Sequence, residues 1–206
     1  MTKGVLYLED DTDWLRGTHF KEILGKGLGV NVNWFDTVRG GLEEIAKEDF
    51  DFDDNIEFFT ELWGDETGAP CEHEMIVKLS EFIDPEKIKS LTVISDNHTP
   101  GMLAGAHLIE AISHISKDFQ PHEKPSLISL MSSNVAIITK DSERQGRWLA
   151  EGIDFVNKND YAMMLLWAAH RKEINPQITF REFYLELTDF PYELNTSIYN
   201  SISDNL

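Results

Sequence analysis

Short apolar segments that end in polar residues alternate along this chain with segments of helical periodicity, and this alternation restricts the possible folds. Five segments have the length and composition of buried strands: residues 4–8, 30–34, 91–95, 126–131 and 153–157. Strands that alternate with helical patterns are typical of βαβ units. The sequence therefore predicts an α/β fold, with a five-stranded parallel sheet and helices on both faces.

The helices are predicted from apolar spacing and from capping residues. Residues 11–13 supply N-caps for a first helix, which Gly25, Gly27 and Gly29 are expected to break. Further helices are predicted over residues 38–45 (with Asp36 or Thr37 as the N-cap), 72–82, 103–115, 144–150 and 161–172.

Two parts of the chain depart from this pattern. Residues 48–90 mix carboxylates with aromatic side chains and are predicted to be an insertion that packs partly or forms a contact surface. The expected organisation is a domain over residues 1–175 that contains this insertion, followed by a C-terminal helical extension over residues 176–206. The helix from Tyr161 is strongly apolar, so the extension is expected to cover part of it, as a fixed cap or as a displaceable lid.

The charge balance excludes some classes of partner. The 206 residues include 18 basic and 37 acidic side chains, which gives a net charge of −19 at pH 7. Such a field opposes the binding of nucleic acid or of an anionic membrane. The single cysteine, Cys71, can form no internal disulfide, and neither a secretory signal nor a membrane-spanning run is evident. We expect a cytoplasmic protein with no nucleic-acid or membrane partner.

Polar side chains follow the predicted strands at the points where these end. In an open parallel sheet, ligands bind outside the carboxyl ends of the strands. The residues at these ends are Glu9 and Asp10 (first strand), Asp96 (third), Ser132 or Ser133 (fourth) and Lys158 (fifth). Taken singly, each has an ordinary alternative role, such as a helix-capping turn for Glu9 and Asp10 or a surface position for Lys158.

Taken together, these side chains predict a site for phosphoryl chemistry. Carboxylates that gather in one crevice repel one another unless a cation joins them, and Mg²⁺ prefers such oxygen ligands. Lys158 supplies a positive charge for a phosphoryl group, and a serine hydroxyl can donate to one of its oxygens. The arrangement suits the transfer of a phosphoryl group onto Asp96.

Three stretches of the chain resemble the receiver domain of two-component response regulators. They are residues 5–13, which end in the acidic run, residues 93–102 around Asp96, and residues 152–158, which end in Lys158. The resemblance covers roughly residues 3–47 and 90–172. It implies a flavodoxin-like fold. The expected partners are a sensor histidine kinase or phosphotransfer protein, which donates the phosphoryl group, and a downstream protein; a homodimer is one of the assemblies left open.

The resemblance also implies a role for each matching residue. Asp96 would be the phosphoacceptor, and Lys158 and Ser132 would contact the phosphoryl group. Phe155 would be the aromatic residue that swings inward on activation. Mg²⁺ would be held by Glu9, Asp10, Asp96 and the backbone carbonyl of His98. Such a domain assists its own phosphorylation and dephosphorylation and acts on no other substrate.

Departures from the family pattern leave two alternatives open. Gly105 falls one residue later than the usual loop glycine, and Asn159 replaces the proline that commonly follows the lysine. A degenerate receiver that is not phosphorylated and acts as an adaptor is the first alternative. The second is a Mg²⁺-dependent phosphohydrolase with Asp96 as nucleophile, although His98 stands where such enzymes usually have a second aspartate.

Overall fold

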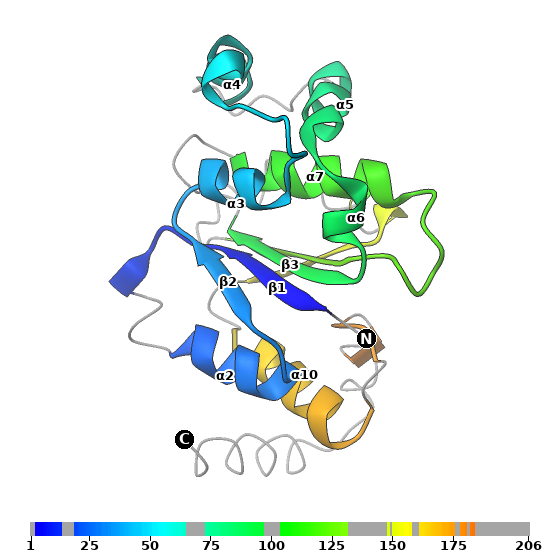
Figure 1. Ribbon diagram of the computed structural model, residues 1–206. Coiled ribbons are helices and arrows are strands. Elements are labelled where there is room, and N and C mark those ends of the chain that lie inside the picture. Colours follow the sequence, from blue (N-terminus) through cyan, green and yellow to red (C-terminus); the bar gives the residue numbers. More distant parts are fainter. Residues whose placement is uncertain are drawn as a thin grey trace.

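The computed structural model describes residues 3–13, 19–64, 73–96, 104–131, 148, 150–157, 161–175, 178–180 and 182–183. In this part of the chain, five parallel strands form one sheet in the order β2-β1-β3-β4-β5 (Figure 1). The strands are β1 (Gly4–Leu8), β2 (Val32–Phe35), β3 (Leu91–Asp96), β4 (Ser126–Met131) and β5 (Ile153–Asn157). This is a flavodoxin-like order, and it confirms the predicted α/β class.

The central strands are mostly apolar, as expected for a sheet with helices on both faces. In β1, the side chains from Val5 to Leu8 are at most 2% exposed. The edge strand β2 begins at Val32 and not at Val30 as predicted, because the N–H of Val30 takes part in capping the C-terminus of the preceding helix. The carbonyl of Gly25 accepts hydrogen bonds from the N–H groups of both Gly29 and Val30, at 2.9 and 3.2 Å.

Helices α2 (Phe20–Leu28) and α10 (Tyr161–Glu173) cover one face of the sheet (Figure 1). The prediction that three glycines break the first helix is wrong for Gly25 and Gly27, which lie inside α2. Gly29 ends this helix in the left-handed conformation, with φ of 69°. Gly27 lies against α10, since a Cβ atom at this position would be 2.7 Å from the Cβ atom of Ala168. The glycine therefore permits the close approach of two helices.

Helices α3 (Val38–Ile45) and α7 (Ala104–Ser116) cover the opposite face (Figure 1). Thr37 caps α3, as its hydroxyl accepts a hydrogen bond from the N–H of Gly40. Helix α7 was expected to be amphipathic, but every residue from Gly105 to Ser113 is buried, including Glu110. The Glu110 carboxylate accepts a hydrogen bond from Nε1 of Trp148 at 2.7 Å, which satisfies this buried polar group.

The segment predicted as an insertion forms an additional helical layer that buries the outer side of α7 (Figure 1). Phe52 and Phe59 stack with ring centroids 4.3 Å apart, and Phe58 and Phe82 join the same cluster. The aromatic residues therefore form a packed core. Of the two expectations for this segment, packing and a contact surface, the structure shows the first. Its elements are the 3₁₀ helix η1 (Asp53–Asn55), α4 (Ile56–Gly64), α5 (His73–Phe82) and α6 (Pro85–Ile88).

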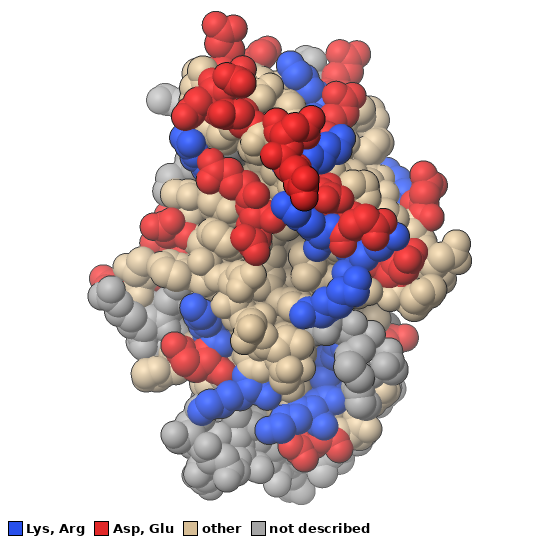
Figure 2. Space-filling view, viewed as in Figure 1, with Lys and Arg blue, Asp and Glu red and all other residues tan. Residues whose placement is uncertain are grey.

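Acidic side chains gather over this additional layer. Figure 2 shows Asp and Glu concentrated over the half of this face that carries α4 and α5, whereas Lys and Arg are spread over both halves. Exposed acidic residues on these two helices include Glu57, Glu61, Glu74 and Glu81. Within the described residues, no helix combines the length and apolar character needed to span a membrane.

Residues that follow α10 pack against it. The side chains of Ile178, Phe180 and Phe183 are at most 4% exposed, and Nε1 of Trp167 donates a hydrogen bond to the carbonyl of Ile178 at 3.1 Å. The rings of Trp167 and Phe180 meet edge to face, with centroids 5.7 Å apart. This start of the predicted C-terminal extension therefore covers part of the apolar surface of α10, as expected.

Candidate functional site

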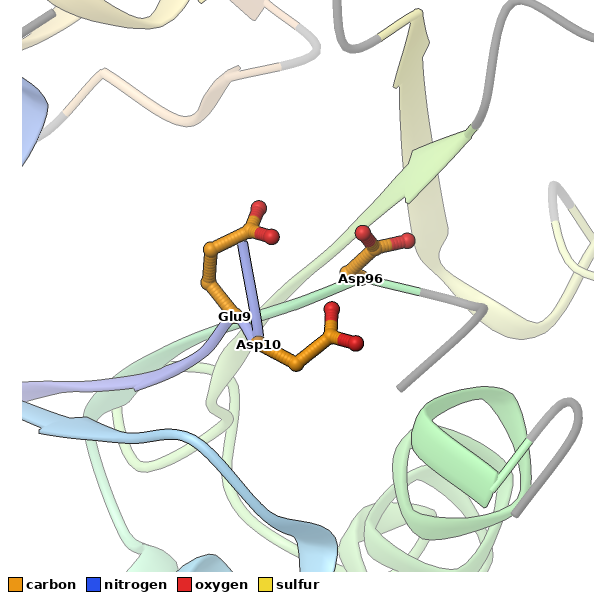
Figure 3. Close-up of side chains that lie close together, drawn as sticks. All are labelled: Glu9, Asp10 and Asp96. Carbon is orange, nitrogen blue, oxygen red and sulfur yellow. The ribbon is translucent and has the colours of Figure 1, made fainter. Parts of the chain in front are cut away.

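Three predicted site residues meet at the carboxyl ends of β1 and β3. Leu8 pairs with Ser95, so the residues that follow each of them emerge next to one another. Figure 3 shows Glu9, Asp10 and Asp96 with their carboxylates around a common space. One oxygen atom from each carboxylate lies within 4.8 Å of the other two. Across the described residues, this is the one group of at least three His, Cys, Asp or Glu side chains with such geometry.

Glu9 is held in place from several directions. Its side chain is fully buried. Its N–H donates a hydrogen bond to the carbonyl of Phe35 at 3.1 Å, which continues the pairing of β1 with β2. Oε1 accepts a hydrogen bond from the N–H of Asp11 at 2.9 Å, and Oε2 accepts one from the hydroxyl of Tyr7 at 3.4 Å. The backbone carbonyl accepts a hydrogen bond from Nε1 of Trp34 at 2.8 Å. The position of Glu9 is therefore set by β1, β2 and the turn that follows.

Asp96 ends β3 and is 5% exposed. The hydroxyl of Ser95 donates a hydrogen bond to the backbone carbonyl of Asp96 at 3.1 Å. Gly105, in the first turn of α7, packs directly on this carbonyl: a Cβ atom at residue 105 would clash with the Asp96 oxygen and with the Ser95 hydroxyl. Gly105, whose sequence position differs from the family pattern, thus has a clear steric role at this site.

We expect Gly105→Ala to destabilise the protein by about 1–2 kcal/mol. The displacement of main-chain atoms by an added methyl group costs about 1–3 kcal/mol, of which alanine's better helix propensity offsets up to about 1 kcal/mol. Urea unfolding followed by circular dichroism measures the difference. Gly4→Ala is the matched control, because the nearest atoms to a Cβ there are 3.7 Å away. Equal unfolding midpoints for Gly105→Ala and wild type would contradict the steric argument.

The negative charge of the site acts on Tyr7. The pKa of the Tyr7 hydroxyl is raised well above its usual range, first by burial and then by the charges of Glu9 and Asp96. The hydroxyl therefore stays protonated and remains a hydrogen-bond donor. Its ring packs in the core, 5.3 Å from that of Phe20 between centroids.

The three carboxylates fit the preferences of Mg²⁺ in type and placement. They offer hard oxygen ligands, and Asp10 is exposed, which leaves access for water and for an anionic ligand. These residues can therefore hold a hard metal ion.

We expect Asp10→Asn to stabilise the protein when no divalent cation is present. Two like charges about 4 Å apart repel by roughly 1 kcal/mol in water, which corresponds to a rise in Tm of about 2–4 °C. Thermal melts in EDTA measure this effect, with Asp36→Asn as a control for an exposed aspartate after the neighbouring strand. Added Mg²⁺ should reverse the order, since wild type binds it better. A lower Tm of Asp10→Asn in EDTA would contradict the repulsion.

The remaining predicted site residues lie outside the described part of the chain. These are His98, Ser132, Ser133 and Lys158. The backbone of Phe155 lies in β5, but its side chain is also outside the described part. Their roles stay predictions.

The structure adds Tyr7 and Trp34 to the neighbourhood of the site, and the sequence analysis assigned neither. Tyr7 could have been found, because residues two apart in a strand face the same side and Tyr7 precedes Glu9 by that spacing. Trp34 reaches Glu9 from the adjacent strand, so its role depends on register, which the sequence does not specify.

Comparison with known proteins identifies no family for this chain. No protein-family model, no curated protein and no solved structure matches this chain.

Proposed function

We propose that this protein is a receiver-like domain that accepts a phosphoryl group on Asp96 and signals through contacts with other proteins. The observation that carries the proposal is the convergence of Glu9, Asp10 and Asp96 at the carboxyl edge of a flavodoxin-like sheet. In this class of fold, that edge is where ligands bind.

The chemistry follows from the roles of the three carboxylates. A carboxylate oxygen of Asp96 attacks the phosphorus atom of a phosphodonor, and the bond from phosphorus to the leaving group breaks as the new bond forms. The leaving group departs with the electron pair. Glu9, Asp10 and Asp96 would hold a divalent cation, and Mg²⁺ bound there would neutralise negative charge on the transferring group. Lys158 and Ser132 are expected to contact the phosphoryl oxygens.

The resemblance to receiver domains implies the partners. A sensor histidine kinase or a phosphotransfer protein would supply the phosphoryl group, and a downstream protein would respond to the phosphorylated state. Phosphorylation would shift an existing equilibrium between two conformations and so change the surface that the partner binds.

Intact-mass spectrometry tests the proposal. Purified protein is incubated with acetyl phosphate and Mg²⁺, and in parallel with acetyl phosphate and EDTA. The expected result is the mass increase of one phosphoryl group in the Mg²⁺ sample and none with EDTA. Absence of an adduct in both samples would favour the non-phosphorylated adaptor. Turnover of small phosphate esters, with no adduct accumulating, would favour the phosphohydrolase.

A further inference from the structure

A buried hydroxyl group lies next to the acidic site. Tyr7 is in β1 and has no exposed surface, and its ring belongs to the apolar cluster that includes Phe20, Ile94 and Trp167. A phenylalanine ring would fill the same space. Burial of a hydroxyl is unfavourable unless the group finds a hydrogen-bond partner, and the partner here is Oε2 of Glu9.

The hydroxyl and one backbone group together fix the orientation of the Glu9 carboxylate. Tyr7 donates to Oε2 and the N–H of Asp11 donates to Oε1, so each oxygen has a donor on a different side. The distance from the Tyr7 hydroxyl to Oε2 is 3.4 Å, longer than the usual range for such bonds. The bond itself is therefore weak, but its donor is fixed in place because the Tyr7 ring is fully buried in the core.

We propose that Tyr7 is a positioning residue that acts through Glu9 to set the affinity of the acidic site for a divalent cation. The inference rests on the proposed function, in which Glu9, Asp10 and Asp96 bind such a cation. Mutation of a group that orients a metal ligand through a hydrogen bond typically lowers the metal affinity by about 10–100-fold.

The test measures Mn²⁺ binding to the full chain by electron paramagnetic resonance, which counts free Mn²⁺. Mn²⁺ accepts the same oxygen ligands as Mg²⁺. We expect Tyr7→Phe to raise the Kd about tenfold or more. Ser116→Ala is the matched control, because it also removes one buried hydroxyl, at the last residue of α7, and its Kd should equal that of wild type.

A double-mutant cycle separates positioning from a general structural effect. If Tyr7 acts through Glu9, then Tyr7→Phe should change the Kd little when Glu9→Gln is already present. An equal loss in both backgrounds would overturn the inference, and so would a Kd of Tyr7→Phe within twofold of wild type. Wild type that binds no Mn²⁺ would instead overturn the proposed function.

A measurement on unaltered protein covers the case in which Tyr7→Phe does not fold. In protein with ¹³C-labelled tyrosine, the ring carbon that bears the Tyr7 hydroxyl should shift when Mg²⁺ is added, because its hydrogen-bond acceptor becomes a metal ligand. A Tyr7 signal that stays in place while the site fills would contradict the proposal.

Discussion

Asp96→Asn is expected to abolish the phosphoryl adduct that forms with acetyl phosphate and Mg²⁺. An amide is a poor nucleophile and cannot form the acyl phosphate, so the effect should be a complete loss. Asparagine has nearly the same shape as aspartate, and the 5% exposed position at the end of β3 should therefore keep its packing. Intact-mass spectrometry of the variant and wild type under the same conditions measures the difference.

Two further variants show whether the loss is specific. Asp36→Asn changes an exposed aspartate that follows the neighbouring strand β2, and it should form the adduct as wild type does. Asp10→Asn removes one metal ligand while it keeps the nucleophile, so its adduct should recover at higher Mg²⁺ concentration. An undiminished adduct in Asp96→Asn would show that another residue accepts the phosphoryl group.

The sheet and the acidic cluster could be predicted because both depend on local patterns. Each strand is a short apolar run with a polar end, and parallel strands deliver their carboxyl ends to one edge. Glu9, Asp10 and Asp96 were therefore expected to meet without knowledge of any side-chain contact, and one oxygen from each does lie within 4.8 Å of the others.

The features that the sequence did not predict depend on contacts between layers. Position 27 inside α2 requires a glycine because the neighbouring Ala168 leaves no room for a side chain, and no local pattern reveals that neighbour. Helix α7 is buried on its outer side because α5 packs there, so the amphipathic expectation, which assumed solvent on one side, was wrong. The contact of Trp34 with Glu9 likewise requires the pairing of β1 with β2.

The same reasoning applies to the residues that follow α10, for which the sequence left a fixed cap and a displaceable lid as alternatives. The structure favours a cap. Phe180 is 4% exposed and packs edge to face on Trp167, which has no exposed surface. Thr179 and Glu182 form reciprocal hydrogen bonds of 2.9 and 3.2 Å between side chain and backbone, a capping box that begins a helical turn at Phe180. Displacement of this segment would expose the buried Phe180 side chain and would therefore cost free energy.

We therefore expect Phe180→Ala to lower the free energy of unfolding by about 3–5 kcal/mol, the usual cost of removing a buried phenylalanine side chain. Because domains are stable by only about 5–15 kcal/mol, this is a large fraction of the total. Urea unfolding monitored by tryptophan fluorescence and by circular dichroism measures the loss. The control is Ile174→Ala, which truncates an apolar side chain just after α10 that is 63% exposed and should change stability by at most about 0.5 kcal/mol.

The outcome also bears on how a partner could read the phosphorylated state. If Phe180→Ala costs several kcal/mol, the segment is a structural cap, and the buried side chains of α10 beneath it are not available to a partner. If Phe180→Ala leaves the unfolding curve unchanged and the variant associates with itself in light scattering, the segment is a lid. The apolar surface of α10 would then become a binding surface when the segment is released. In that case the contact between Phe180 and α10 contributes little to stability, and phosphorylation of Asp96 could release the segment at a small cost in free energy.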